Sequence, residues 1–345
     1  MKKYGYSKIL LLLLLVFISC SESEELKNTQ QPKLVQTNKN GEIINDNNKI
    51  ENQTGEGILL NFKLIKDKTY LMKININQVM TQTIEGQKQD LKQKMGVGYT
   101  FKVLENKADS VYLIEVKFSS IYQEVEGPTG KVSFDSKKKD NVESPFSMIF
   151  PKIIGKKLIS ELKPNGEIIS VKGEKELVDE VLKALDVTNE SIRKELGKSI
   201  KEQFGANSIK DMLEHSWAYL GNQNRKIGDS WKQSHSISGG LPITVFNTWT
   251  LNEISKDEII LGLKSSLKTK EKNPYAQIGI LKVKYDLTGS QDGSYKLDKN
   301  SCWLLKAEIN QKISGKVILE KSQENPEEKN WPLSVVSKYI IEAEE

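Results

Sequence analysis

Two cysteines and two histidines are the side chains of this sequence best suited to nucleophilic or acid–base chemistry. Cys20 and Cys302 lie near opposite ends of the chain, and His215 and His235 lie between them. A catalytic thiol needs a nearby base to form the thiolate. Cys302 instead begins an apolar run, Cys302-Trp303-Leu304-Leu305. We therefore expect Cys302 to be a buried structural thiol, without a disulfide partner if Cys20 is modified.

The histidines give weak signals for catalysis. His215 follows Glu214 in an expected helix, and sequence neighbours point to different helix faces, so a surface or capping role is favoured over a general base. His235 lies between Ser234 and Ser236, which suggests a serine hydrolase. Such an enzyme would carry its nucleophile in a Gly-x-Ser-x-Gly elbow, which the chain lacks. We expect no catalytic residues and a protein that is not an enzyme.

Residues 286–293, with the sequence Asp-Leu-Thr-Gly-Ser-Gln-Asp-Gly, are rich in oxygen ligands. A calcium loop counted from Asp286 would need glycine at its sixth position and glutamate at its twelfth, where Gln291 and Leu297 stand. The segment therefore predicts a β-turn between two strands. Zinc-type Cys/His spacing and a phosphate-binding glycine loop are also missing, so we expect no metal and no cofactor.

The N-terminus has the three parts of an export signal. Lys2, Lys3 and Lys8 form a positive start, Ile9 to Ile18 is an unbroken apolar run, and a small residue, Ser19, comes directly before Cys20. An apolar run of about ten residues is half of the roughly 20 that a membrane-spanning helix needs. Residues 1–19 are therefore predicted to be a signal peptide.

The stretch Phe17-Ile18-Ser19-Cys20 resembles a lipobox, with Phe17 in the place usually taken by leucine. The resemblance implies cleavage between Ser19 and Cys20 and lipidation of the Cys20 thiol. Two or more acyl chains hold a protein stably on a membrane. We therefore expect a lipoprotein whose membrane partner is reached through Cys20.

The acidic cluster Ser21-Glu22-Ser23-Glu24-Glu25 follows the modified cysteine. Serine after the cysteine is similar to outer-membrane sorting signals, and the cluster is similar to surface-export signals of Bacteroidetes lipoproteins. The alternative is a solvated start to a linker. The expected location is the outer membrane, on its periplasmic or cell-surface side.

The formal charge of +5 for the whole sequence overstates the charge of the mature protein. Loss of residues 1–19 removes three lysines and no acid, which lowers the formal charge to +2. Acids and bases are interspersed along the remainder, without a basic stripe with interleaved aromatic residues. A nucleic-acid partner is therefore not expected.

Periodicity divides the rest of the chain. Residues 20–56 predict a flexible polar tether, because they carry too few apolar residues to offset the entropy of ordering. Residues 57–345 predict one body, with a β meander over 57–173, a helical block over about 174–221 and a second β meander over 225–345. The expected fold class is α+β, with a curved, mostly antiparallel sheet and a central helical block.

Particular elements support this division. Tyr112, Ile114, Val116 and Phe118 fall on one face of a predicted strand, and Glu115 and Lys117 fall on the other, as in a half-buried strand. Lys163-Pro164-Asn165-Gly166 predicts a hairpin turn. Apolar residues at helical spacing predict three helices between 174 and 220, the third beginning near a capping box at Ser208. Later predicted strands include Val245 to Ile254, Glu258 to Leu267, Ile278 to Leu287, Gly293 to Leu297, Cys302 to Ile309 and Ser314 to Leu319.

The two β halves resemble each other around 99–118 and 248–267, which indicates either a duplication or the general likeness of amphipathic meanders. The whole pattern resembles a family of Bacteroidetes outer-membrane lipoproteins of unknown function. The most specific pieces are 166–173, Gly228-Asp229-Ser230-Trp231 and 293–298, with Asn300-Ser301 in place of an expected Thr-Gly turn. The family carries no known catalytic residues.

Two functions remain open at this stage. A curved sheet half-closed by helices could hold a hydrophobic ligand or lipid in the cell envelope without catalysis. Alternatively, the body could be a scaffold that binds an envelope protein or surface glycan through strand edges or loops. The five tryptophans could line a pocket in the first case or fill an ordinary core. The sequence identifies no protein partner.

Overall fold

The computed structural model describes residues 57–84, 86–107, 111–128, 130–138, 145–236, 241–270, 275–278, 281–321 and 329–343. The predicted signal peptide, the cleavage site at Ser19 and Cys20, and the tether lie outside the described residues.

Long antiparallel strands dominate this part of the chain. The first half contains β1 (Ile58–Leu59), β2 (Thr69–Ile84), β3 (Gln87–Lys107), β4 (Val111–Gly127), β5 (Gly130–Asp135), β6 (Lys157–Leu162) and β7 (Ile168–Lys172). The second half contains β8 (Asn224–Arg225), β9 (Ser230–Ser236), β10 (Ile243–Ile254), β11 (Glu258–Thr269), β12 (Ala276–Ile278), β13 (Leu281–Asp298), β14 (Leu304–Leu319) and β15 (Lys329–Glu342).

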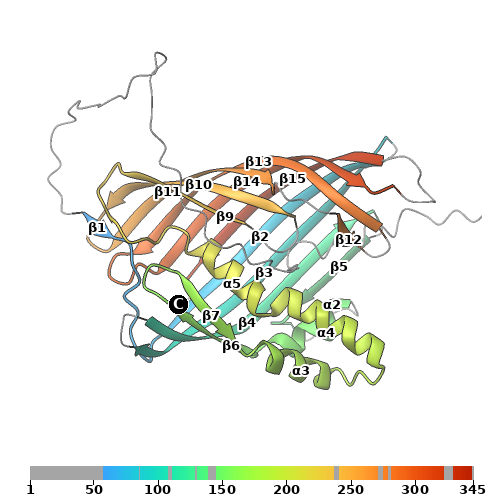
Figure 1. Cartoon of the computed structure of the whole chain (residues 1–345), viewed down its shortest axis with the longest axis horizontal. Helices are drawn as coiled ribbons and strands as arrows, with labels where there is room; N and C mark the ends of the chain where they lie inside the picture. The colour runs from blue at the N-terminus through green and yellow to red at the C-terminus, as the bar shows by residue number, and fades with distance from the viewer. Residues whose placement is uncertain are drawn as a thin grey trace, which may run out of the picture.

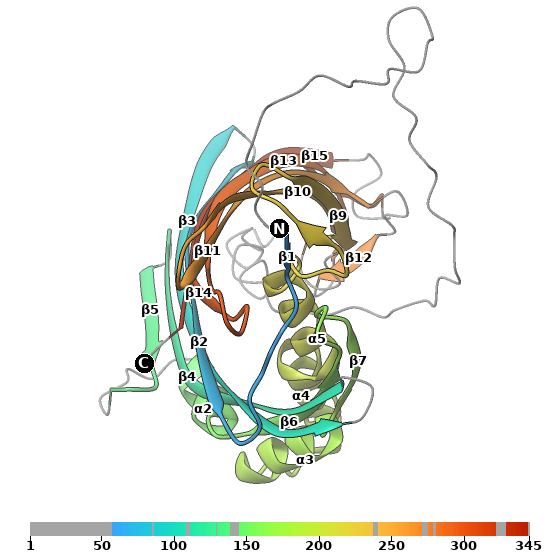
Figure 2. The same ribbon diagram turned by 90° about the vertical axis from the view of Figure 1, so that its left-hand side faces the viewer.

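Almost all of these strands join one sheet, in the order β7-β6-β4-β3-β2-β15-β14-β13-β11-β10-β9, with β12 on β13 and β5 on β4. The two halves of the chain meet where β15 pairs with β2. Figure 2 looks along this sheet and shows it wrapped into an arc, with β7 and β9 at its two edges. Strands β1 and β8 form a separate two-stranded pair.

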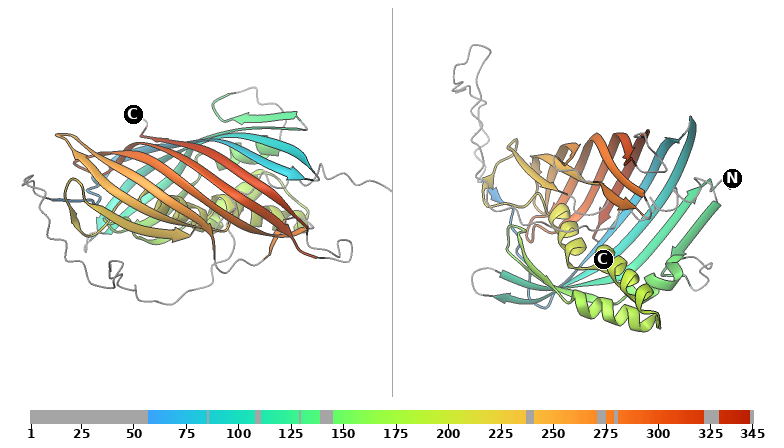
Figure 3. Two further views of the ribbon diagram at one scale, coloured as in Figure 1. Left: turned by 90° about the horizontal axis from the view of Figure 1, so that it is seen from above. Right: turned by 45° about the vertical axis from the view of Figure 1, so that its right-hand side comes forward.

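Four helices accompany the sheet in the described part of the chain: α2 (Pro145–Ile153), α3 (Glu174–Ala184), α4 (Glu190–Phe204) and α5 (Ala206–Ser216). The side chain of Asn189 caps α4 by accepting the Ile192 N–H at 3.0 Å, which satisfies one of the donors that a helix start leaves unpaired. The helices gather along one margin of the sheet (Figures 1 and 3), and α5 packs against the edge strand β7.

The concave face carries the main core where the helices meet the sheet. Phe101 of β3 contacts Trp217, just after α5, with ring centroids 5.8 Å apart, and Trp303 at 5.3 Å. Phe118 of β4 meets Phe204 of α4 edge-on at 5.7 Å. Offset and edge-to-face pairs of this kind add to the burial of large apolar surfaces. This end of the concave face is filled by protein side chains.

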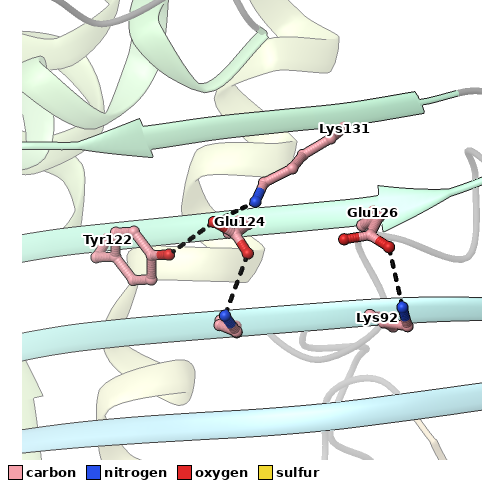
Figure 4. Close-up of polar contacts among 6 residues, drawn as sticks. Lys92, Tyr122, Glu124, Glu126 and Lys131 are labelled. Atoms are coloured by element: carbon pink, nitrogen blue, oxygen red, sulfur yellow. Dashed lines mark hydrogen bonds and ion pairs between the residues drawn. The ribbon is translucent and has the colours of Figure 1, made fainter.

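The convex face is charged, and ion pairs link its neighbouring strands (Figure 4). Glu124 of β4 accepts from Lys131 of β5 at 3.0 Å and lies 3.4 Å from Lys94 of β3. The hydrogen bond from Lys131 lowers the pKa of Glu124 below its usual value. Lys92 and Glu126 pair at 3.0 Å along the same strands. Exposed pairs stabilise little, but their charge keeps this face in water.

The predicted α+β class, with a central helical block over 174–221, was wrong. About 60% of the described residues form strands and 17% form helices, so the protein is mostly β. The two predicted meanders form one continuous antiparallel sheet, and the helices cover one end of it. Sequence periodicity identified α3 to α5, but it cannot show that strands far apart in the chain pair into a single layer.

The structure confirms one local prediction and contradicts two others. The hairpin at 163–166 is confirmed, with Gly166 at φ 85° between β6 and β7. The β-turn predicted at 286–293 was wrong, because these residues lie within the single strand β13. Helix α5 begins after Gly205, so Ser208 is not its cap; the Ser208 hydroxyl donates to the Gln203 carbonyl. Helix α2 was not predicted.

The turn was predicted from the polar composition of residues 286–293, but the side chains of these residues alternate between the two faces of the sheet, as in a strand. Asp286 and Asp292 point outward to solvent, while Leu287 and Gln291 between them point inward and are buried. At Gly293, an added Cβ would lie 2.6 Å from the Glu308 carbonyl oxygen of β14. Glycine therefore serves here for close approach between strands rather than for a turn.

We predict that Phe101→Ala lowers the free energy of unfolding by about 3–5 kcal/mol, because it leaves a cavity among packed aromatic rings. The matched control is Phe246→Ala on the convex face, where the side chain is 47% exposed; a change within about 0.5 kcal/mol is expected there. Urea unfolding followed by circular dichroism measures both. Equal effects of the two substitutions would contradict the assignment of the buried face.

Candidate functional site

The concave face is the part of the molecule on which polar and apolar groups are arranged most regularly. Successive side chains of a strand point to opposite faces, so every second residue faces inward. On β2 the inward residues run from Tyr70 and Met72 to Gln78, Met80 and Gln82. The antiparallel registers place inward residues of neighbouring strands directly opposite each other, so that they form rows across the sheet.

One of these rows is polar and uncharged on eight consecutive strands. From β3 to β9 its members are Gln93, Gln78, Ser337, Gln311, Gln291, Ser265, Asn247 and Gln233. We call this set the polar row. Asn247 and Ser337 are each 2% exposed and Gln291 is 3% exposed, so the row lies inside the protein.

Hydrogen bonds link members of the polar row in pairs. The pairs are Ser265 Oγ donating to Asn247 Oδ1 at 2.7 Å, Gln311 Nε2 donating to Gln291 Oε1 at 3.1 Å, and Ser337 Oγ donating to Gln78 Oε1 at 3.1 Å. At the β9 end, Gln233 Nε2 donates to the Leu220 carbonyl at 3.0 Å. The row is thus held at one end by the segment that follows α5.

Beyond the polar row, on the side away from the helices, the concave face is apolar. Its buried residues are Met80, Leu91, Val125, Leu241, Ile243, Val245, Leu267, Val283, Tyr285, Leu287, Ile313, Val317, Leu333 and Val335. We call this set the distal strip. All but Leu241 belong to strands, and no described helix contributes to it.

The dimensions of the sheet matter for the distal strip. The strip crosses eight strands, from β4 to β10 in sheet order. At about 4.8 Å per strand this is an arc of roughly 34 Å, and an arc of that length bent into a half-circle keeps its ends about 20 Å apart. Sheets that pack directly on each other lie about 10 Å apart. The ends of such an arc lie farther apart than two directly packed sheets, yet every residue of the distal strip is at most 5% exposed.

The two histidines, twenty positions apart in the sequence, meet where α5 approaches β9. His215 Nδ1 and His235 Nε2 lie 2.7 Å apart, and one ring donates to the other. His235 Nδ1 has no hydrogen-bond partner in the described part of the chain. Burial lowers the pKa of His215 to about 4 and that of His235 to about 3, so both rings are neutral at pH 7.

The two serines beside His235 are not placed for the histidine pair to activate them. A general base for a serine needs a hydroxyl within hydrogen-bond reach, and the neighbouring Ser234 and Ser236 alternate onto the outward face of β9. Ser236 instead hydrogen-bonds with Thr244 of β10 at 3.2 Å. The pair links helix α5 to the edge strand β9 and so holds the helix against both edges of the sheet.

Cys302 is buried, as predicted, at 1% exposure. Burial raises the pKa of its thiol, which keeps the thiol protonated, and the Cys302 carbonyl accepts a hydrogen bond from the Tyr219 hydroxyl at 3.0 Å.

The tryptophans mostly fill the core: Trp217, Trp249 and Trp303 are each at most 3% exposed and belong to the helix-covered cluster.

A hollow of about 570 Å³ lies over β9, β10 and β11, beside Lys232, Phe246 and Lys264. Its lining combines lysine, serine, threonine, glutamine and asparagine with one phenylalanine, which suits water better than an apolar ligand. Within the described residues, no group of three metal-ligating side chains comes together. In the same residues, no helix combines the length and the apolarity that crossing a bilayer requires.

The polar row was missed in the sequence, although a signal for it existed. In β14 the inward series Ala307, Ile309, Gln311, Ile313 breaks its apolar alternation at one position, and β2 breaks in the same way at Gln78. Each break looks like an isolated irregularity. Only the strand registers align the breaks into one row.

The chain belongs to a family of unknown function, DUF6263, which matches residues 109–304. No curated protein matches the sequence. Among solved structures, lipovitellin, described for its lipid–protein interactions, gives a TM-score of 0.45 at 7% identity over 82% of this chain. This chain spans 26% of the lipovitellin chain.

Two outer-membrane structures are similar at a lower level. OccK2 of Pseudomonas aeruginosa in complex with glucuronate has a TM-score of 0.21 and 6% identity, over 84% of this chain and 98% of that one. OmpF of Salmonella typhi in complex with daunomycin has a TM-score of 0.19 and 6% identity, over 80% and 98%. Similarities at these scores carry no argument about function.

We predict that the histidine pair makes the protein less stable in mild acid. An unfolded histidine titrates near pH 6.5, so below that pH the unfolded chain binds protons that the folded protein does not. The free energy of unfolding should fall by at most about 1.4 kcal/mol per pH unit for each histidine as the pH drops toward the lowered folded values.

Urea unfolding at pH 7.5, 6.0 and 5.0 measures this slope. The double variant His215→Gln, His235→Gln should show a flatter dependence over this range, and Ser234→Ala, at the exposed position beside His235, should keep the original slope. An unchanged slope in the histidine variant would show that other groups cause the acid sensitivity.

Proposed function

We propose that this protein is a non-enzymatic lipoprotein of the bacterial cell envelope that holds an acyl lipid against the distal strip. The observation that carries the proposal is an apolar face built almost entirely from strands, to which no described helix contributes. A one-sided sheet must bury its apolar face against another layer. The helices supply that layer at one end, and lipid chains supply it at the other.

An acyl lipid suits the strip better than a polar small molecule. The strip offers leucine, isoleucine, valine and methionine with no charged side chain, and burial of each methylene there contributes about 0.8 kcal/mol. Ligand sites of this kind are mostly apolar, with a few polar groups that set orientation. The polar row provides such groups beside the strip.

The membrane attachment in this proposal rests on the sequence. The lipobox-like stretch ending at Cys20 supports acylation, and Ser21 with the acidic cluster after it supports the outer membrane as the location. A tethered body that binds lipid would work next to the bilayer that supplies or receives its ligand.

The lipid should co-purify with the protein. Mass spectrometry of an organic extract from natively purified full chain is expected to find acyl lipid in stoichiometric amount. Val335→Trp, which projects a large ring into the distal strip, should roughly halve that lipid without unfolding the protein, because lipid chains can give way to added bulk. Val336→Trp on the outward face, where Val336 is 48% exposed, is the matched control.

Two other outcomes would contradict the proposal that the distal strip holds a lipid. A lipid-free extract, combined with a loss of about 1–3 kcal/mol of stability in Val335→Trp, would mean that protein already packs the strip tightly. A lipid-free protein that sediments as a dimer would instead place a second copy on the strip.

The anchor has its own test. Cells given radiolabelled palmitate should label the wild-type protein and Cys302→Ala equally, while Cys20→Ala should lose the label and leave the membrane fraction, since no acyl chain remains to hold it there. Label that persists in Cys20→Ala would refute lipidation at this residue.

A further inference from the structure

The polar row leaves hydrogen-bonding groups unused inside the protein. Gln291 Oε1 accepts from Gln311, but Gln291 Nε2 has no partner in the described part of the chain, and Gln291 is 3% exposed. At the β9 end, Gln233 Oε1 also lacks a partner among these residues. Gln82, which faces inward beside the distal strip, leaves its Oε1 unpaired in the same way.

Unused buried groups of this kind are costly. A buried donor or acceptor without a hydrogen-bond partner costs about 1–3 kcal/mol of folding free energy. If the polar row served only to fix the strand register, we would expect all of its amide groups to be paired. Here one free donor, Gln291 Nε2, faces inward at the middle of the row, and one free acceptor, Gln233 Oε1, lies at its β9 end. A second free acceptor, Gln82 Oε1, lies outside the row, two inward positions beyond Gln78 on β2. This combination fits a ligand that brings both an acceptor and a donor.

The surroundings of the row determine the charge that such a ligand can carry. The inward row on the helix side consists of Met95, Ile76, Tyr339, Ile309, Gly293, Leu263, Trp249 and Trp231. The inward row on the other side consists of Leu91, Met80, Val335, Ile313, Gly289, Leu267, Val245 and His235. Neither row contains Lys, Arg, Asp or Glu.

A carboxylate or phosphate placed on the polar row would therefore be buried without a countercharge. Burial of an unpaired ion costs far more than burial of a hydrogen-bonded neutral group. Lysine side chains of β9 and β11, such as Lys232 and Lys264, alternate onto the outward face and cannot neutralise such a ligand. An uncharged polar group is the chemistry that this row accepts.

We propose that the polar row binds the ester carbonyl and hydroxyl groups of a neutral acyl lipid, whose chains lie along the distal strip. Gln291 Nε2 donates to the ester carbonyl, and the free glutamine oxygens accept from hydroxyl groups. This inference rests on the proposed function, and it adds that the lipid is a neutral ester and not a fatty acid or phospholipid.

Three fluorescent probes with related apolar parts test the inference on the full chain carrying Cys20→Ser, which removes the predicted acylation site. The probes are cis-parinaric acid, its methyl ester, and diphenylhexatriene, which has no polar group. At pH 8 the methyl ester should bind about tenfold more tightly than the acid, because the acid is ionised and must either bury an unpaired carboxylate or take up a proton.

A substitution at the free donor then tests the residue. Gln291→Met keeps the length of the side chain and should weaken binding of the methyl ester about three- to tenfold, the value of one lost hydrogen bond. Binding of diphenylhexatriene should stay within about twofold, because its contacts are apolar. Gln87→Met, at an exposed position in β3, is the matched control and should change neither.

The outcomes separate the two proposals. If diphenylhexatriene and both parinaric probes fail to bind, the proposed function itself is wrong. If diphenylhexatriene binds but the wild-type protein binds acid and ester equally, or prefers the acid, lipid binding stands and the neutral-ester inference is overturned. An ester preference that survives in folded Gln291→Met overturns the role of Gln291. The wild-type comparison decides the inference even if that variant does not fold.

Discussion

The structure depends on one constraint: a single sheet with one apolar face must cover that face along its whole width. Eleven strands in an unbroken hydrogen-bonded order produce one wide concave surface with buried apolar residues along it. Helices α2 to α5 cover one end and share with the sheet a core of aliphatic and aromatic side chains. The fold thus creates, at the other end, an apolar surface that protein secondary structure in the described part of the chain does not cover.

The polar row divides these two regions. Buried amides and hydroxyls are costly unless they form hydrogen bonds. The polar row therefore specifies the register of its eight strands, because a slip of one residue in a strand would turn that strand's member of the row outward. The helix end of this arrangement is fixed by His215 and His235, which join α5 to β9, and by Gln233, which joins β9 to the turn after α5. The contacts that join α5 and the following turn to β9 therefore also fix the β9 end of the polar row.

The family match and the sheet cover different parts of the chain. Residues 109–304 contain both edges of the sheet, the helices and the turn segments, but β2, β3 and β15 lie outside this range and β14 lies almost entirely outside it. Those four strands form the centre of the sheet and carry half of the polar row, including Gln78 and Gln311. The candidate site thus combines residues from within the matched region with residues beyond it.

The sequence alone determined the strands and helices with strong periodicity, the Pro-Asn-Gly hairpin and the burial of Cys302, since each depends on neighbours in the chain. It could not determine that β13 continues through 286–293, that α5 closes the gap between β7 and β9, or that Gln78, Gln291 and Asn247 share one row. Those features depend on pairing between strands up to about 260 positions apart, as for Ser337 and Gln78. Alternation states which face a residue occupies, but only tertiary pairing states which residues stand beside it.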